Sequence, residues 1–188
     1  MIVRQSIQNC FRELALSTPY EDISVTRICK ETGVSRASFY DSFQNKETVL
    51  SSIVQDDVVD SQHRMLETIP TFRIKSSPQI LMELIYQSIA DHERFYSRIN
   101  RVEHGSLLVR ILTERLSALN DVVLKDFELP DDEKAYTAFF FSAANASLIS
   151  RWLTRKMDVE PTRLAHLFNK WTLSYWQKIS PVKQEWME

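Results

Sequence analysis

Residues 24–50 contain two short helical patterns separated by one glycine, and this arrangement constrains the fold more than any other part of the chain. Ser24 and Ser35 each stand directly before a helical pattern, where a serine oxygen can accept from free backbone N–H groups of the first turn. Gly33 can end the first helix in the left-handed conformation with little strain. The spacing therefore predicts two short helices that meet at a sharp turn.

The second of these helices, expected over residues 35–43, has two distinct faces. Phe39 and Phe43 lie one turn apart and can anchor one face. The other face carries Arg36, Ala37, Ser38 and Tyr40. In a helix-turn-helix protein the second helix enters the major groove and its N-terminal residues contact base edges. The pattern therefore predicts a recognition helix with Arg36, Ala37 and Ser38 at the bases.

Two residues further along are suited to phosphates. Tyr40 and Lys46 carry polar ends that can reach a phosphate. Asn45 can cap the next helix, so that free backbone N–H groups and the Lys46 cation could meet the same phosphate. Phosphate contacts of this kind position a protein on DNA but do not specify sequence.

The run from Ile23 to Leu50 resembles the N-terminal domain of the tetracycline-repressor (TetR/AcrR) family of one-component bacterial transcription regulators, whose pattern includes F-Y-x-x-F-x-x-K-E-x-L. The matching residues are Ser24, Val25, Ile28, Cys29, Gly33, Val34, Ser35, Phe39, Tyr40, Phe43, Lys46, Glu47 and Leu50. The resemblance implies DNA contacts at Ser24, Val25, Thr26, Ser35, Arg36, Ala37, Ser38, Tyr40 and Lys46. It departs at Ser42, where the family commonly has a histidine.

The composition of the 188-residue chain fits an all-α protein, because glycines are few and long stretches lack proline. The net charge is −2, and the first fifty residues hold six basic and six acidic side chains, so DNA binding must rest on local placement of cations. No signal peptide or membrane span is visible, and Cys10 and Cys29 fit a reducing compartment, which predicts a cytoplasmic protein.

Helical periodicity divides the chain into a helix-turn-helix domain over 1–46 and a helical regulatory and dimerisation domain over 47–188. A long helix is expected from Lys46 to about Thr68, followed by a linker over 71–78. The other helices are expected over residues 3–16, 78–90, 93–101, 106–127, 132–156 and 161–179. The long helix can join the head to the body, so that a tilt at one end displaces the other.

The last two helices carry more apolar and small residues than are needed to pack each helix against its own protomer along one stripe. The resemblance implies a dimer formed by two such helices from each chain. The segment ending at Trp152 and Leu153 resembles a Firmicutes-type C-terminal domain. The interface is expected at Ala143, Ala146, Ser147, Trp152, Leu164, Phe168, Trp171 and Tyr175. An aromatic-rich monomer core is the alternative.

An effector pocket, if the body has one, should lie among the middle helices and be mainly apolar. Its expected walls are Tyr86, Phe95, Tyr96, Ile99, Leu108, Leu112, Phe139 and Phe140, although each also fits an ordinary core. No residue indicates the chemistry of the effector.

The sequence contains no enzyme motif, cofactor motif or metal motif, so we expect neither catalysis nor a bound cofactor or metal. Asp56, Asp60 and His63 share one helix face and could gather a cation, but a solvated surface face explains them as well. The favoured function is a homodimeric transcriptional regulator, most often a repressor in this family, that binds a palindromic operator and responds to a small molecule. The alternatives are a protein-binding adaptor that has lost its DNA contacts and an all-helical metal-dependent enzyme.

Overall fold

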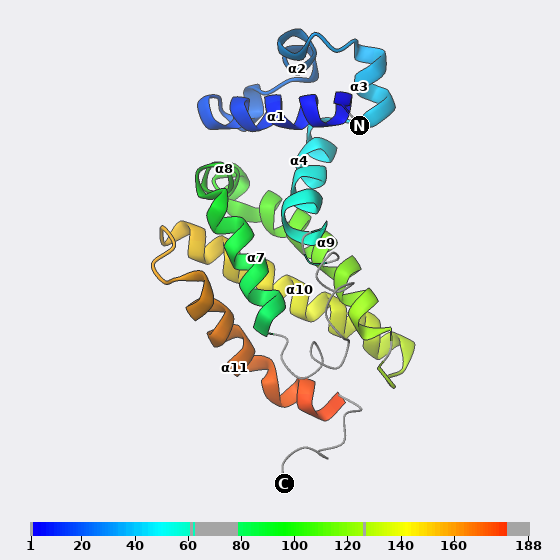
Figure 1. Ribbon diagram of the computed structural model, residues 1–188, viewed down its shortest axis with the longest axis vertical. Coiled ribbons are helices and arrows are strands. Elements are labelled where there is room, and N and C mark those ends of the chain that lie inside the picture. Colours follow the sequence, from blue (N-terminus) through cyan, green and yellow to red (C-terminus); the bar gives the residue numbers. More distant parts are fainter. Residues whose placement is uncertain (1, 61, 63–78, 126, 180–188) are drawn as a thin grey trace.

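The computed structural model shows a small helical head that stands on a larger helical body (Figure 1). It describes residues 2–60, 62, 79–125 and 127–179, with the side chains of 122 and 176–179 left out of the description. Only helices and their connections occur among these residues, as the all-α prediction requires.

The head contains three helices and a short 3₁₀ turn, and α4 leads from it into the body (Figure 1). The elements in chain order are α1 (Ile2–Ser17), η1 (Tyr20–Asp22), α2 (Val25–Thr32), α3 (Arg36–Ser42), α4 (Lys46–Val54), η2 (Gln55–Val59), α7 (Gln79–Asp91), α8 (Glu93–Ile99), η3 (Val102–Gly105), α9 (Ser106–Leu124), α10 (Asp131–Thr154) and α11 (Pro161–Ile179).

The turn between α2 and α3 forms as its sequence predicts. The Ser24 hydroxyl accepts from the Arg27 N–H at 3.2 Å, and the Ser35 hydroxyl accepts from the Ser38 N–H at 3.1 Å. Gly33 closes α2 with φ of 71°, in the left-handed region that glycine enters without a side-chain clash. These local interactions fix the angle at which α3 leaves α2.

α4 begins at Lys46, where the Asn45 side chain accepts from the Thr48 N–H at 2.9 Å, but it does not continue as a uniform α-helix. Residues Gln55–Val59 form a π-helical stretch, in which the Asp60 N–H donates to the Gln55 carbonyl. Such insertions widen one turn and occur frequently at functional sites. The predicted continuation to Thr68 and the predicted linker over 71–78 lie outside the described residues.

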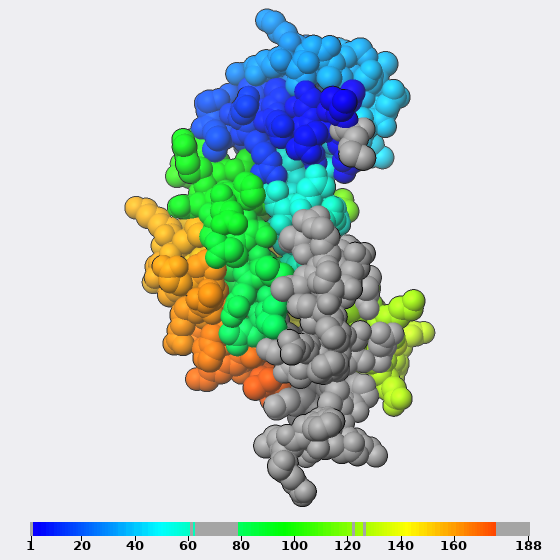
Figure 2. All heavy atoms as spheres, in the orientation of Figure 1, coloured from blue at the N-terminus to red at the C-terminus, as the bar shows by residue number. Residues whose placement is uncertain are grey.

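In the body, α10 packs along α9 and α11 packs along α7, while α8 lies beneath the head (Figure 1). One hydrophobic cluster runs without a break from Phe11 and Phe39 in the head, through Ile53 of α4, to Trp152 and Leu164 in the body. In the space-filling view the head rests directly on α4 and α8 (Figure 2). The continuous core makes the two parts mechanically connected.

The remaining helices lie within three residues of their predicted bounds. α9 ends at Leu124 rather than at residue 127, and the expected 93–101 helix ends at Ile99 because Val102–Gly105 form a separate 3₁₀ turn. Glu103 and His104 have positive φ values there. Among the described residues, the structure contains no helix with the length and apolar character needed to cross a bilayer.

Candidate functional site

The outward surface of α3 consists of the residues that the sequence assigns to DNA. Arg36, Ala37 and Tyr40 are exposed, with 52% of the Tyr40 surface open to solvent. On the opposite face Phe39 is fully buried and Phe43 nearly so, and their ring centroids lie 6.0 Å apart. The two phenylalanines hold α3 against the head and leave its polar face free to meet a ligand.

The first turn of α3 is ordered by its own side chains. The Ser35 and Ser38 hydroxyls lie 2.9 Å apart and share a hydrogen bond, while the Ser35 oxygen also caps the helix. Ser38 is only half-buried, so its hydroxyl can keep this bond and still face a base or phosphate. Arg36 has no ion-pair partner among the described residues, which leaves its guanidinium available for bidentate contacts.

The N-terminus of α2 carries three more residues that the sequence assigns to DNA. Ser24 and Thr26 are exposed there, and Val25 is half-buried against the core. Nearby, the Arg27 guanidinium pairs with Glu31 at 2.9 Å on the surface of α2. The cap hydroxyl and the N–H groups of this first turn form the kind of surface that binds phosphate.

Lys46 has a structural role that the sequence did not indicate. Its ammonium donates to the Tyr20 carbonyl at 2.6 Å and to the Glu21 carbonyl at 3.2 Å, and it lies 4.3 Å from the centroid of the Tyr20 ring. Burial lowers the pKa of Lys46, while Glu21 and Asp22 act in the opposite direction. Two of its three N–H groups are therefore used to hold the η1 turn, and its phosphate contact stays a prediction.

A partly buried ion pair joins the head to the π-helical stretch below α4. The Arg12 guanidinium on α1 contacts the Asp57 carboxylate at 2.6 Å, and the Tyr96 hydroxyl on α8 donates to the other Asp57 oxygen at 2.7 Å. Arg12 also lies over the Phe95 ring, 5.1 Å from its centroid. Burial raises the pKa of Tyr96, and the neighbouring Asp57 charge raises it further. Three helices thus meet at one carboxylate.

Asp56 and Asp60, which could have gathered a cation, accept hydrogen bonds from other side chains of the protein. Asp56 accepts from the Gln8 amide of α1 at 2.6 Å, and Asp60 accepts from the Gln55 amide at 2.8 Å. His63 lies outside the described residues. Within the part of the chain that the structure describes, no group of three or more potential ligands is placed to hold a metal.

The outer face of α10 and α11 exposes large apolar side chains. Tyr136, Phe139, Phe140 and Trp171 are each more than half exposed. Together with Ala143, Ala144, Ser147 and Tyr175 they form what we call the outer aromatic face. A contiguous apolar surface of this kind is typical of an interaction site.

The eight residues expected at a dimer interface divide between this face and the protomer's interior. Ala146, Trp152, Leu164 and Phe168 are buried within the protomer, so little of their surface is open to a partner chain. Ala143, Ser147, Trp171 and Tyr175 do lie on the outer aromatic face. Sequence reasoning missed Tyr136, Phe139 and Phe140 there, although they continue the Ala143 stripe at helical spacing.

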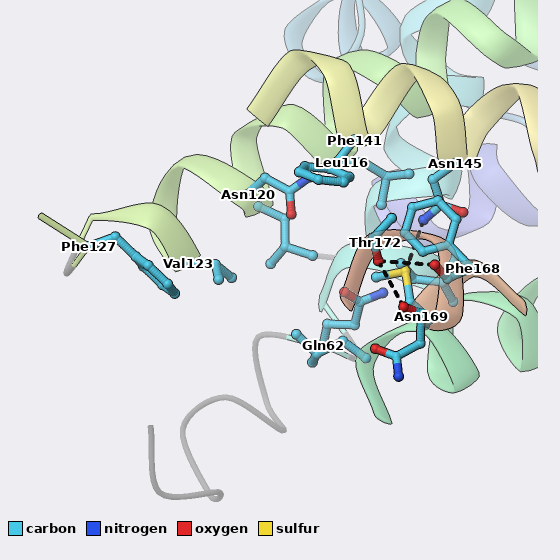
Figure 3. A pocket seen from close by; sticks show the side chains of 14 residues that line it. Gln62, Leu116, Asn120, Val123, Phe127, Phe141, Asn145, Phe168, Asn169 and Thr172 are labelled. Atoms are coloured by element: carbon cyan, nitrogen blue, oxygen red, sulfur yellow. Dashed lines mark hydrogen bonds between the residues drawn. The ribbon is translucent and has the colours of Figure 1, made fainter. Parts of the chain in front are cut away.

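The body contains a partly open cavity between α7, α9, α10 and α11 (Figure 3). Its apolar walls include Leu81, Ile85, Leu116 and Phe141, and its polar groups come from Gln62, Asn120, Asn145, Asn169 and Thr172. Figure 3 shows the Gln62, Asn169 and Thr172 side chains at the same end of the cavity.

None of the eight residues expected at an effector pocket lines this cavity. Tyr86, Phe95, Tyr96, Ile99, Leu108 and Leu112 belong to the packed core. Phe139 and Phe140 point outward instead. Tyr86 contacts the cavity lining indirectly, because its hydroxyl donates to Asn145, a lining residue, at 2.8 Å.

Sequence profiles of two known families match the chain. The profile of bacterial regulatory proteins of the tetR family matches residues 12–53. The profile of a transcriptional regulator C-terminal region matches residues 76–173. The first range contains α2, the turn and α3, and the second contains most of the described body.

Individual relatives are distant but similar over most of their length. The dhaKLM operon transcriptional activator DhaS of Lactococcus lactis subsp. lactis (strain IL1403) is 23% identical over 167 residues, covering 85% of this chain and 84% of the relative. The nucleoid occlusion factor SlmA of Shewanella sp. (strain W3-18-1) is 25% identical over 186 residues, covering 89% and 90%.

Solved structures show the same fold. A TetR-family transcriptional regulator from Syntrophomonas wolfei superposes with a TM-score of 0.65 at 16% identity, covering 96% of this chain and 97% of the other. The structure of the dihydroxyacetone kinase operon activator DhaS gives a TM-score of 0.62 at 20% identity, covering 95% and 98%.

Proposed function

The chain belongs to the tetR family of bacterial regulatory proteins and is a DNA-binding transcriptional regulator, and on this premise we propose that it binds a palindromic operator as a homodimer. In this proposal it acts as a repressor in the cytoplasm and releases DNA when a small molecule binds in its body. The observation that carries the DNA proposal is the surface of α3, where Arg36, Ala37 and Tyr40 are exposed above the buried Phe39 and Phe43.

Selection of bound duplexes from a random pool at moderate salt tests operator binding and returns the operator sequence. Arg36→Ala should then weaken binding and relax the base preference at one position of each half-site, at about 1–3 kcal/mol. Tyr40→Phe should weaken binding to all duplexes alike, because a phosphate contact carries no sequence information.

Arg94→Ala is the matched control, because it removes a positive charge from an exposed position on α8. It should leave both affinity and base preference unchanged. Equal losses for Arg36→Ala and Arg94→Ala would mean that DNA responds only to net charge, which contradicts the proposed recognition helix.

The dimer proposal rests on the outer aromatic face. Association through this face would cover the exposed rings of Phe140 and Trp171, and the small Ala143 and Ser147 would let two α10 helices approach closely. A twofold dimer must then hold its recognition helices about one DNA turn, roughly 34 Å, apart.

Ala143→Arg should convert the dimer to monomers in analytical ultracentrifugation, because it places an unpaired charge at the centre of this face. Leu16→Glu is the control, since Leu16 is an exposed apolar residue on α1, outside the outer aromatic face. A monomeric parent protein at micromolar concentration, or a dimer that survives Ala143→Arg, would contradict the proposal.

The effector proposal rests on continuity between the cavity and α4. Gln62 lines the cavity, and its amide nitrogen donates to the Val58 carbonyl of the helical run 46–60, which starts beside the head. A ligand that favours one arrangement of this run shifts the population of dimers whose heads match the operator. A reporter gene placed behind the selected operator measures whether the protein represses or activates it.

A further inference from the structure

The described walls of the body cavity disfavour a charged ligand. Among the described residues that line it, none carries a charge, and most are Leu, Ile, Val, Met or Phe. A carboxylate, phosphate or ammonium group that entered would lose its water and find no opposite charge, at a cost of many kcal/mol. The described lining therefore favours an uncharged occupant.

Two polar atoms in the cavity lack partners. The Gln62 side chain is fully buried, and neither its Oε1 atom nor Oδ1 of Asn169 has a hydrogen-bond partner among the residues that the structure describes. The Gln62 amide nitrogen donates to the Val58 carbonyl at 3.0 Å, which fixes the orientation of the carboxamide and leaves its oxygen unpaired. Buried polar atoms are almost always paired, so both oxygens call for a donor.

The other polar groups of the cavity are already satisfied by protein partners. Asn145 accepts from Tyr86, and Asn120 donates to the Ser142 hydroxyl at 2.8 Å. The Thr172 hydroxyl donates to the Phe168 carbonyl at 3.0 Å (Figure 3). The two unpaired buried oxygens of Gln62 and Asn169 therefore call for two hydrogen-bond donors.

The cavity volume of about 50 Å³ limits the size of the occupant. A buried water needs roughly 10–15 Å³ on the same measure and fills about 30 Å³ as liquid, so the space suits about four waters or one molecule of roughly 120 Å³. That is the size of a three-carbon diol. From this volume and the two unpaired acceptors, we propose that the cavity binds a small uncharged diol, whose hydroxyl groups donate to Gln62 and Asn169.

The proposed function adds a regulatory consequence, and only this part of the inference rests on it. The Gln62 amide nitrogen donates to Val58 of the helical run 46–60, so a hydroxyl bound to the Gln62 oxygen is linked to the same run that meets the head. Diol binding should then change operator affinity through α4 and the π-helical stretch.

The test titrates the full-length protein, without DNA, with propane-1,3-diol, 1-propanol and propanoate, and follows its amide resonances by NMR. The diol should bind in the millimolar range and about fivefold or more tighter than 1-propanol, because it satisfies both oxygens. Propanoate should not perturb the cavity residues. A diol no tighter than 1-propanol, or bound propanoate, would overturn the proposal.

Variants assign the contacts. Asn169→Leu and Gln62→Met each remove one acceptor and should bring diol affinity down to that of 1-propanol. Thr172→Val lines the same cavity but loses a hydroxyl that already has its partner, so it should keep the preference for the diol. Unchanged diol affinity in all three variants would contradict the assignment, as would a crystal structure in diol that shows only ordered waters in the cavity.

The ligand site and its effect on operator binding can be disproved independently of each other. Diol binding without any change in operator affinity would remove the regulatory consequence and keep the ligand site. A protein that binds the diol but selects no duplex would overturn the proposed function and leave the ligand site standing.

Discussion

The contact between Arg12 and Asp57 allows a quantitative test of how the head is held on the body. In Asp57→Asn the side chain keeps its shape but loses its charge, so the Arg12 guanidinium stays in a largely buried position beside a neutral amide. The Tyr96 hydroxyl also exchanges a charged acceptor for a neutral one. Both consequences weaken the same junction of α1, α8 and the π-helical stretch.

The expected size follows from burial. Removing one partner of a fully buried ion pair costs about 3–5 kcal/mol, and a hydrogen bond to a charged group contributes about 1.5–3 kcal/mol. The side chains of Arg12 and Asp57 are 22% and 9% exposed, so water partly screens the guanidinium. We therefore expect Asp57→Asn to lower the free energy of unfolding by about 2–3 kcal/mol, and the melting temperature by about 4–12 °C.

Urea denaturation followed by circular dichroism measures this loss, with Asp121→Asn as the control because Asp121 is exposed on α9. The control should stay within about 0.5 kcal/mol of the parent protein. A double-mutant cycle with Arg12→Met should give a coupling energy of about 1.5–3 kcal/mol. A loss no larger than that of the control, or two additive single variants, would show that the pair does not stabilise the junction.

Four further predictions concern single sites. Gly33→Ala should lower the free energy of unfolding by about 1–2 kcal/mol in urea denaturation, because a φ of 71° strains any side chain, although the space around Gly33 is open. Gly105→Ala should lower it further, because the added Cβ would lie 2.6 Å from the Ser150 hydroxyl. Burial raises the pKa of the Cys10 thiol to about 11. Its reaction with Ellman's reagent at pH 8 should therefore be about 100-fold slower than in urea and should accelerate up to about pH 11. Burial also raises the pKa of Tyr20 to about 12, so the stability that it contributes is present below about pH 10 and is lost between pH 10 and 12. Tyr20→Phe should flatten this alkaline loss in pH-dependent melting, and an unchanged slope would contradict it.

Local hydrogen bonding explains what the sequence could determine. Ser24, Ser35 and Asn45 cap helices within three residues of their own positions, and Gly33 closes α2 through its own backbone angles. Such interactions need only nearby chain, so spacing and residue type predict them. Helical periodicity likewise separates the anchored face of α3 from its exposed face, as seen at Phe39.

Only the tertiary structure decided which face of each body helix meets which neighbour. Phe139, Phe140 and Phe141 occupy consecutive positions on α10 and cover most of its circumference, so periodicity does not predict which of them faces the core. The fold buries Phe141 and exposes the other two. The partners of Lys46 and Asp57 lie 26 and 45 residues away. Contacts over such distances depend on how whole helices pack, because the chain between them is too long for local geometry to fix their approach.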